Sequence, residues 1–371
     1  MSDRPAFDPT RPWPADRAPP PADVVVVADF RSGRSESFAP RTLLFLAMWM
    51  EHAGAAREWP LHLVGIGEPP EVVRSLAARA GARVSVTAPW PYEGRGTLNK
   101  LRGLQLPGDT DRILLLDADV YALDDPSSIT TLGDGLALAP CIVPRVPQAQ
   151  WQQLFEALGV PLPTARIPCI QAEVGGPPTH KLLYEDQLRD MPAMLPYYNA
   201  GVILAPRDCG LLEVWERFVL DARDALGEDR WLKVVDGDQT ALVPAVELLR
   251  ARGLALARLP WALHASDAML YSGACSVREL KLFHAFGLFR RMSARGLDIE
   301  RGWRAWRRRL FRFYRENGWR HPQDDGDPGD DPVEVQLRKL WRRLRRPWRR
   351  HVEPLLAPAG SPDGHGHAAD A

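Results

Sequence analysis

The chain has 371 residues, of which 45% are hydrophobic and 25% charged, as is usual for a globular protein with a sizeable core. Its 47 basic and 47 acidic residues cancel, so the net charge implies no particular partner, and no stretch reaches the ~18 apolar residues that span a bilayer. The four cysteines lack C-x-x-C spacing, which argues against a zinc module and favours reduced thiols.

Residues 1–22 are rich in proline and are predicted to be disordered. They lack the apolar core of a signal peptide, so we expect a cytoplasmic protein. The β-branched run from Val24 to Ala28 is predicted to form a first buried strand.

Helices and strands are then predicted to alternate. A helix over 40–53, with Pro40 at its first position, is followed by a strand over 61–66, a helix over 70–80, a strand over 83–86, a helix over 97–106 and a strand over 113–116. This alternation predicts an α/β fold with a mostly parallel, Rossmann-like sheet and helices on both faces.

The second half of the domain has shorter predicted elements separated by loops rich in proline and glycine. We expect strands over 136–141, 200–205, 254–259 and 280–283, and helices over 148–158, 208–225 and 238–252.

The stretch Arg112 to Val120 contains the most informative feature of the chain. Its apolar run predicts a strand buried on both faces, and it ends in two carboxylates, Asp117 and Asp119. Ligands of open α/β sheets bind at the carboxyl ends of the strands. A pair of carboxylates there suits a hard divalent cation, and such a cation suits a diphosphate.

Four other segments also carry groups suited to ligand binding. Three of them have a plain structural interpretation as well: a capped surface helix for Asn99 and Lys100, a helix N-cap for Asp238 and a satisfied core residue for His284. Gly201, at the mouth of a strand, would let the backbone approach a ligand closely. In chain order the groups are Asn99 with Lys100, Asn199 with Gly201, Asp238 with Gln239, and His284.

Taken in order, these segments resemble the GT-A-fold glycosyltransferases that use nucleotide sugars, and most closely their family 8, the glycogenin-like group. The matching motifs are Asp117-Ala118-Asp119, Asn199-Ala200-Gly201-Val202, Asp238-Gln239 and His284-Ala285-Phe286-Gly287. The resemblance covers residues 23–290 and implies a GT-A domain there. We expect a basic helical extension over 291–356 and a disordered tail over 357–371.

The resemblance also implies roles for individual residues. It implies that Asp117, Asp119 and His284 hold a divalent metal, with Mn²⁺ favoured over Mg²⁺ because one ligand is an imidazole. It implies transfer of a sugar from a nucleoside diphosphate, most plausibly UDP, with retention at the anomeric carbon. Asp238 and Gln239 would be the catalytic pair beside the transferred sugar. The donor would be bound by Ala28, Asp29, Asn99, Lys100, Asp117, Asn199, Gly201 and Gly287.

The sequence departs from family 8 in two places. The stretch Phe30 to Ser35, in the region where the family contacts the nucleotide, does not match its pattern. The family usually follows its H-x-x-G motif with Lys-Pro-Trp, whereas this chain has Leu288-Phe289-Arg290. Three alternatives therefore stay open: a sugar-phosphate nucleotidyltransferase, suggested by the basic loop Arg31 to Arg34; a GT-A-like protein that binds a nucleotide sugar without catalysis; and a phosphatase of the haloacid dehalogenase class. The acceptor is unknown.

A basic, tryptophan-containing stretch follows over 301–350. Within it, residues 333–350 are predicted to form an amphipathic helix that either packs on the domain or lies on an anionic membrane surface, at the inner face of the membrane. We find no recognised nucleic-acid-binding module and expect no specific nucleic-acid partner.

Overall fold

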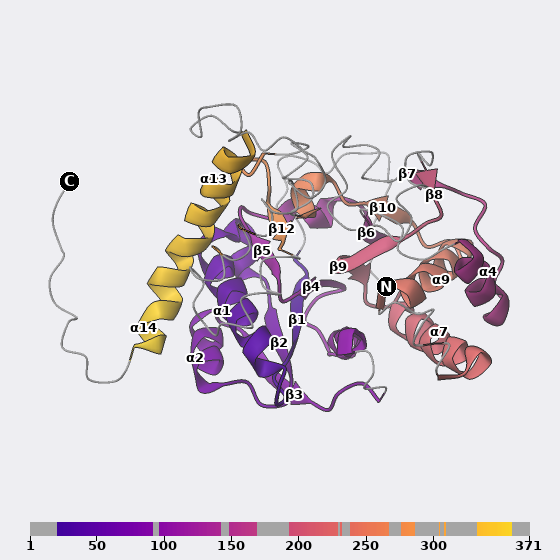
Figure 1. The fold of residues 1–371 in the computed structure, drawn as a ribbon, viewed down its shortest axis with the longest axis horizontal. Helices are drawn as coiled ribbons and strands as arrows, with labels where there is room; N and C mark the ends of the chain where they lie inside the picture. Colours follow the sequence, from indigo (N-terminus) through magenta and orange to yellow (C-terminus); the bar gives the residue numbers. More distant parts are fainter. Residues whose placement is uncertain are drawn as a thin grey trace, which may run out of the picture.

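The computed structural model describes residues 21–91, 96–141, 148–168, 193–228, 231, 238–266, 276–285, 304, 308 and 332–357. Its central sheet has seven strands: β1 (Asp23–Asp29), β2 (Leu61–Ile66), β3 (Arg83–Thr87), β4 (Arg112–Asp117), β6 (Leu136–Pro140), β9 (Tyr198–Pro206) and β10 (Leu256–Arg258). The strand order is β10-β6-β9-β4-β1-β2-β3 (Figure 1). Neighbours pair in parallel except β9, which is antiparallel to β4 and β6. The predicted mostly parallel α/β sheet is confirmed.

Helices cover both faces of this sheet. They are α1 (Ser35–His52), α2 (Glu71–Arg79), α3 (Leu101–Leu104), α4 (Gln148–Ala157), α7 (Leu211–Leu226), α9 (Asp238–Ala251), α13 (Pro332–Pro347) and α14 (Glu353–Leu356). Short 3-10 helices are η1 (Gly54–Glu58), η2 (Gly96–Lys100), η3 (Ser127–Thr131) and η4 (Trp261–Leu263), and a π-helical turn, η7 (Trp348–Val352), joins α13 to α14.

The two faces of the sheet belong to two separate hydrophobic cores, because successive strand residues point to opposite sides. Val24 and Val26 of β1 face the core that contains α1, α2 and α13. Val25, between them, faces the core that contains α3, α4, α7 and α9. Burial on both faces explains why these strands are apolar without alternation.

The largest differences from the predicted boundaries concern two helices. Helix α1 begins at Ser35, five residues before Pro40, so the prediction that Pro40 starts the helix is wrong. A turn in which Arg31 O accepts the N–H groups of Arg34 and Ser35 leads into the helix, and the buried Pro40 is tolerated inside it. The single helix predicted over 97–106 is instead η2 followed by the one-turn α3.

A second, smaller sheet lies next to the carboxyl end of β4. It has three strands in the order β11 (Ala265–Ser266), β12 (Leu282–His284) and β5 (Val120–Ala122). Strand β5 follows Asp119 directly and is antiparallel to β12, with Val120 opposite His284. This register brings a histidine from late in the chain beside the two aspartates. A two-stranded pair, β7 (Ile167–Pro168) and β8 (Ala193–Met194), lies apart from both sheets.

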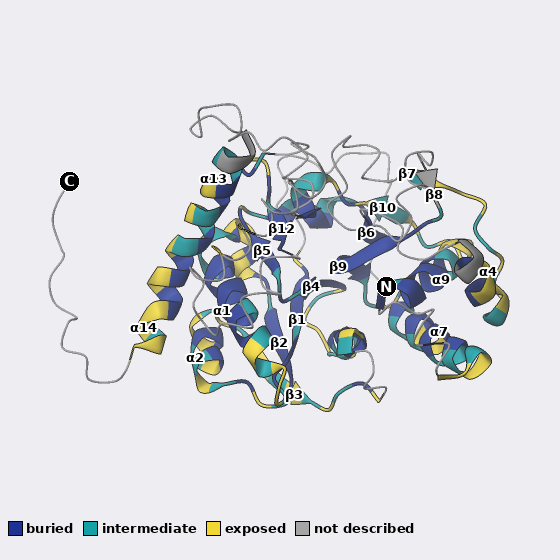
Figure 2. Cartoon of the chain, viewed as in Figure 1, coloured by how far each residue is buried: buried dark blue, intermediate teal, exposed yellow. Residues whose placement is uncertain are grey.

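The C-terminal helix belongs to the main core. Leu337, Leu340, Leu344, Trp348 and Val352 are each 0–2% exposed and pack into the same core as α1. Figure 2 shows the buried side of α13 turned toward α1 and its exposed side turned outward. The apolar stripe is therefore covered by protein, and the prediction that it lies on a membrane is wrong for this face. In the described part of the chain, no helix combines the length and apolarity needed to cross a bilayer.

Candidate active site

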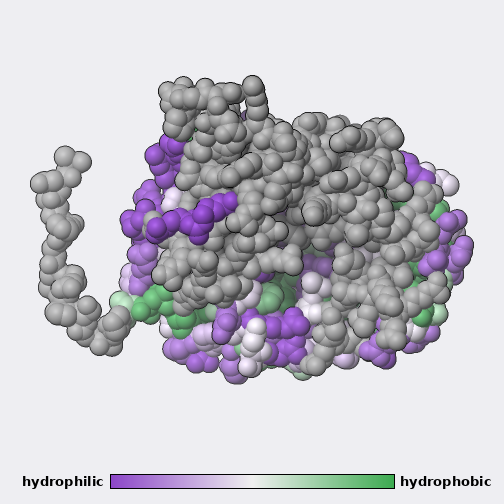
Figure 3. Space-filling model, viewed as in Figure 1, coloured by the Kyte–Doolittle hydropathy of each residue, from purple (hydrophilic) through white to green (hydrophobic). Residues whose placement is uncertain are grey.

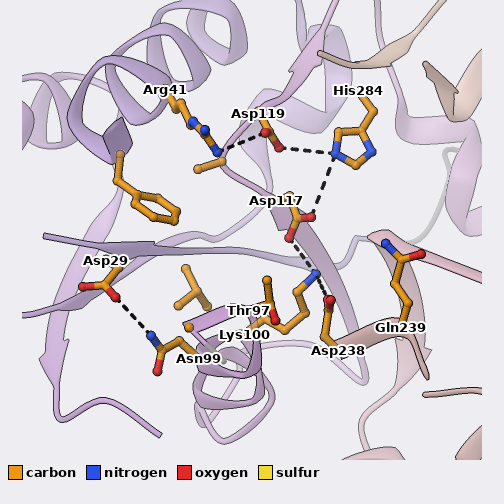
Figure 4. Close-up of a pocket in the computed structure, with 14 residues that line it drawn as sticks. Asp29, Arg41, Thr97, Asn99, Lys100, Asp117, Asp119, Asp238, Gln239 and His284 are labelled. Carbon is orange, nitrogen blue, oxygen red and sulfur yellow. Dashed lines mark hydrogen bonds and ion pairs between the residues drawn. The ribbon is translucent and has the colours of Figure 1, made fainter. Parts of the chain in front are cut away.

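A pocket of about 350 Å³ opens at the carboxyl ends of β1 and β4 (Figure 4). The chain runs from β1 to β2 and β3 on one side and returns to β4 on the other side of β1, and open α/β sheets bind ligands at the carboxyl ends of the strands where the order reverses in this way. Its described wall consists of Val27, Asp29, Phe38, Arg41, Gly96, Thr97, Asn99, Lys100, Asp117, Ala118, Asp119, Asp238, Gln239 and His284.

The three predicted metal ligands meet in this pocket. The ligand atoms of Asp117, Asp119 and His284 lie within 4.8 Å of one another. His284 Nε2 is 3.3 Å from Asp119 Oδ1 and 4.0 Å from Asp117 Oδ2. The backbone N–H of Ala285 donates to Asp119 O, which ties β12 to the turn between β4 and β5. Two carboxylates and an imidazole form a donor set that suits a divalent transition metal.

Asp117, Asp119 and His284 shift one another's pKa values. Burial raises the pKa of Asp119, but the hydrogen bond with His284 and the nearby Arg41 guanidinium lower it to about 2. Burial lowers the pKa of His284, yet Asp119 and Asp117 raise it above its ordinary value. The pKa of Asp117 is raised, mainly by burial, against the opposing effect of Lys100. The two aspartates thus attract positive charge to this point.

Lys100 connects Asp117 to the predicted catalytic aspartate. Its Nζ lies 2.8 Å from Asp117 Oδ1 and 2.5 Å from Asp238 Oδ2, and donates to Ala200 O at 2.9 Å. Although burial lowers the pKa of Lys100, the two carboxylates raise it above its usual value. The ammonium group therefore has three protein partners, and its main contacts are with carboxylates. The alternative of a capped surface helix is wrong, because Asn99 and Lys100 are buried.

Asn99 and Asp29 form a second polar pair in the pocket wall. Asn99 Nδ2 donates to Asp29 Oδ2 at 3.3 Å, and Asn99 Oδ1 accepts the backbone N–H of Trp90. Asp29 also accepts hydrogen bonds from the guanidinium group and the backbone N–H of Arg31. Both side chains are therefore held by the protein at the end of β1.

Arg41 is a pocket residue that the sequence analysis did not identify. It lies on α1, and its Nη1 donates to Asp119 Oδ2 at 3.2 Å. Its guanidinium carbon lies 5.4 Å from the ring centroid of Phe38, which also lines the pocket. The available signal was an arginine in the first turn of the predicted helix over 40–53, but nothing in the sequence indicates that this position lies beside Asp119, 78 residues later.

Other predicted donor-binding residues lie elsewhere. In the described part of the chain, Ala28, Asn199 and Gly201 are buried or packed outside the pocket wall. Gln239 lines the pocket, and its Oε1 accepts a hydrogen bond from the Cys141 thiol, with Sγ at 3.5 Å. The prediction for Gly287 falls outside the described residues.

The balance of charge in the pocket favours a bound cation. The wall carries four carboxylates, Asp29, Asp117, Asp119 and Asp238, and only two side chains of fixed positive charge, Lys100 and Arg41. A diphosphate would be repelled from this wall, whereas a divalent cation would reverse its sign. The residues present therefore fit a divalent metal with an anionic ligand.

No known family profile and no curated protein matches the sequence. Solved structures with a similar fold include the galactosyltransferase LgtC in complex with donor and acceptor sugar analogs, at 15% identity over 76% of this chain and 99% of that chain, with a TM-score of 0.43. They also include the glycosyltransferase GlyE of Streptococcus pneumoniae TIGR4, at 14% identity over 80% of this chain and 64% of that chain, with a TM-score of 0.45. A third is mouse xyloside xylosyltransferase 1, at 14% identity over 72% of this chain and 98% of that chain, with a TM-score of 0.40. At these values the similarity does not transfer activity or substrate to this chain.

Proposed function

We propose that this protein is a metal-dependent glycosyltransferase that moves a sugar from a nucleoside diphosphate to an acceptor. The observation that carries the proposal is the convergence of Asp117, Asp119 and His284 in a pocket that also contains Arg41. The proposed metal is Mn²⁺, and the proposed donor is a UDP-sugar, as the resemblance to family 8 implies. The GT-A assignment and retention at the anomeric carbon are parts of the same proposal.

The leaving group in this reaction is a nucleoside diphosphate whose negative charge grows as the glycosyl bond breaks. A divalent cation held by Asp117, Asp119 and His284 would act as a Lewis acid toward those phosphate oxygens. Arg41 is the described cation best placed to assist, because it lines the pocket and is anchored to Asp119 at 3.2 Å. Arg41 would thus supply the positive charge that family 8 enzymes obtain from the lysine of their Lys-Pro-Trp motif, which this chain lacks.

Asp238 and Gln239 are the proposed residues beside the transferred sugar. Asp238 begins α9, and its carboxylate is held by Lys100 at 2.5 Å. A fixed carboxylate can stabilise the positive charge that develops on the sugar ring. The Lys100 ammonium links this carboxylate to Asp117, so the sugar and metal ends of the proposed site share one buried ion-pair network.

Calorimetric titration with UDP would test the proposal. Wild-type protein should bind UDP with Mn²⁺ and lose binding in chelator, and Asp119→Asn should lose the metal-dependent part. Asp221→Asn, at an exposed site on α7, is the matched control and should bind like wild type. Binding of UDP that needs neither Mn²⁺ nor Asp119 would refute the metal site.

The alternatives differ in their products. Release of UDP from a UDP-sugar supports a glycosyltransferase. Formation of UTP from a UDP-sugar and pyrophosphate would identify a nucleotidyltransferase instead. Metal-dependent binding without turnover of any donor would favour a protein that only binds nucleotide sugars.

We also propose that the protein associates with anionic membrane surfaces through charge. Arginines line a shallow groove on α13 and η7, and hydrophilic side chains gather along α13 in Figure 3. The groove residues are Arg342, Arg345, Arg346, Arg349 and Arg350. Because the apolar stripe is buried, attachment would be electrostatic and would weaken with salt.

The test compares wild type with a triple variant, Arg342→Gln, Arg346→Gln and Arg349→Gln, in vesicle sedimentation. Substitution is preferable to truncation, because α13 contributes to the core. Binding to anionic but not neutral vesicles, lost in the variant, supports the proposal. Equal binding of the two proteins would refute it.

A further inference from the structure

A second buried histidine lies directly behind the proposed metal ligand. His264 Nε2 is 3.4 Å from His284 Nδ1, and the two rings meet edge to face, with centroids 5.5 Å apart and an angle of 71° between their planes. His264 and His284 are only 3% and 2% exposed. His264 does not line the pocket, and no motif of the sequence identified it.

The ring of His264 is itself held in place. Its Nε2 lies 3.1 Å from Asn199 Oδ1, which also accepts the backbone N–H of Gly201 at 2.7 Å. These contacts keep the His264 ring against the Nδ1 edge of His284.

Gly201 also restricts the position of the His284 ring, from another side. A Cβ atom at position 201 would lie 2.4 Å from His284 Cε1 and 2.7 Å from His284 Nδ1. Real Cβ atoms do not approach other atoms so closely, so the imidazole occupies space that any other residue would fill. A glycine at position 201 is therefore required by the His284 side chain.

An irregularity in the pairing of β9 makes room for the His284 ring. Between Leu138 and Ala139 the pairing of β6 with β9 shifts from Ile203 to Asn199. Residues 200–202 are thereby released from β6. In this short stretch, Ala200 O accepts a hydrogen bond from Lys100, and the backbone N–H of Gly201 donates one to Asn199 Oδ1.

We propose that His264 is a positioning residue for the metal site: together with Asn199 and Gly201 it confines the His284 ring so that Nε2 faces Asp119 and Asp117. The inference rests on the proposed function, because it assigns these residues to the metal ligand. A ligand held in its binding geometry before the metal arrives loses less freedom on binding, which raises metal affinity.

The experiment measures Mn²⁺ affinity in the presence of UDP and nitrogen coupling to bound Mn²⁺ by pulsed electron paramagnetic resonance. His264→Ala and Gly201→Ala should each weaken Mn²⁺ binding about ten- to a hundredfold and reduce the imidazole coupling. His264→Phe keeps a flat ring against His284 and should recover most of the affinity. A structural role alone would lower thermal stability without changing the coupling.

His62→Ala is the matched control, because His62 is also buried but lies at the other end of the sheet. It should leave Mn²⁺ affinity and nitrogen coupling unchanged. If wild type binds Mn²⁺ and folded His264→Ala binds it equally well with the same coupling, the inference fails while the proposed function stands. If wild type binds no Mn²⁺, the proposed function fails and the inference fails with it. Should His264→Ala not fold, His264→Gln takes its place with the same expected loss.

Discussion

Two clusters of carboxylates and histidine lie at opposite ends of the same sheet. Asp23, His62 and Asp109 meet near the amino ends of β1, β2 and β4. Asp117, Asp119 and His284 meet at the carboxyl end of β4. Both clusters have the composition of a metal site, so residue type alone does not distinguish them.

The clusters differ in what the protein supplies around them. Asp23 is fully buried and accepts hydrogen bonds from Arg207, from the backbone and hydroxyl of Thr110 and from the backbone of Asp109. Arg207 neutralises it at 2.7 Å. Asp117 and Asp119 instead face a pocket whose carboxylates outnumber its cations. A cluster whose charge is already balanced holds the fold together, and one with a charge in excess can bind a ligand.

The largest effect expected is on stability at the amino end of the sheet. Asp23→Ala removes the buried partner of Arg207 and should lower the free energy of unfolding by about 3 to 5 kcal/mol. Urea denaturation measures the loss. Mn²⁺-dependent UDP binding per folded molecule should stay near the wild-type value, and a selective loss of that binding would show that the two ends are not separate in function.

The next effect is on binding at the carboxyl end. Asp119→Asn removes a proposed metal ligand and should weaken Mn²⁺-dependent UDP binding by more than about a hundredfold, since even residues behind the ligands affect affinity by ten- to a hundredfold. The unfolding free energy should change less than in Asp23→Ala. Wild-type affinity in this variant would contradict the assignment of the pocket.

A third prediction concerns the stability of the fold at low pH. Burial raises the pKa of Asp23, but the hydrogen bonds from Arg207, Thr110 and Asp109 outweigh it and lower the pKa below its ordinary value. The unfolded chain therefore takes up this proton first, so the stability that Asp23 contributes is present above about pH 4 and is lost as the pH falls further. Asp23→Asn should flatten this part of the pH dependence of unfolding. An unchanged slope between pH 4 and pH 2 would contradict it.

The smallest expected effects, on stability and on Mn²⁺ affinity, come from replacing the histidine of each cluster by glutamine. His62 Nε2 lies 3.2 Å from Asp23 Oδ1, so His62→Gln should cost about 1 kcal/mol of stability, the worth of one hydrogen bond. Its Mn²⁺ binding should be unchanged. His284→Gln should instead weaken Mn²⁺ binding at least tenfold. Similar outcomes for the two variants would remove the distinction between the clusters.

Much of the fold was predictable because its signals are local. The apolar runs around Val25 and Leu115 predicted strands buried on both faces, and β2 has the predicted bounds. Helix starts were harder to predict, because Pro40 fits both the first position and the interior of α1. Asp117 and Asp119 were predicted from the buried strand that they follow, whereas His284 was identified only through the order of motifs along the chain.

What the sequence determined by itself is the alternation of strands and helices and the presence of two carboxylates after a buried strand. These follow from hydrophobic period and residue type, which neighbouring residues define. Tertiary structure decided which charges are balanced. Lys100 meets Asp117 and Asp238, Arg41 meets Asp119, and the apolar stripe of α13 meets α1. These partners are far apart in the chain, and whether a polar group is satisfied or available depends on the neighbours that folding brings to it.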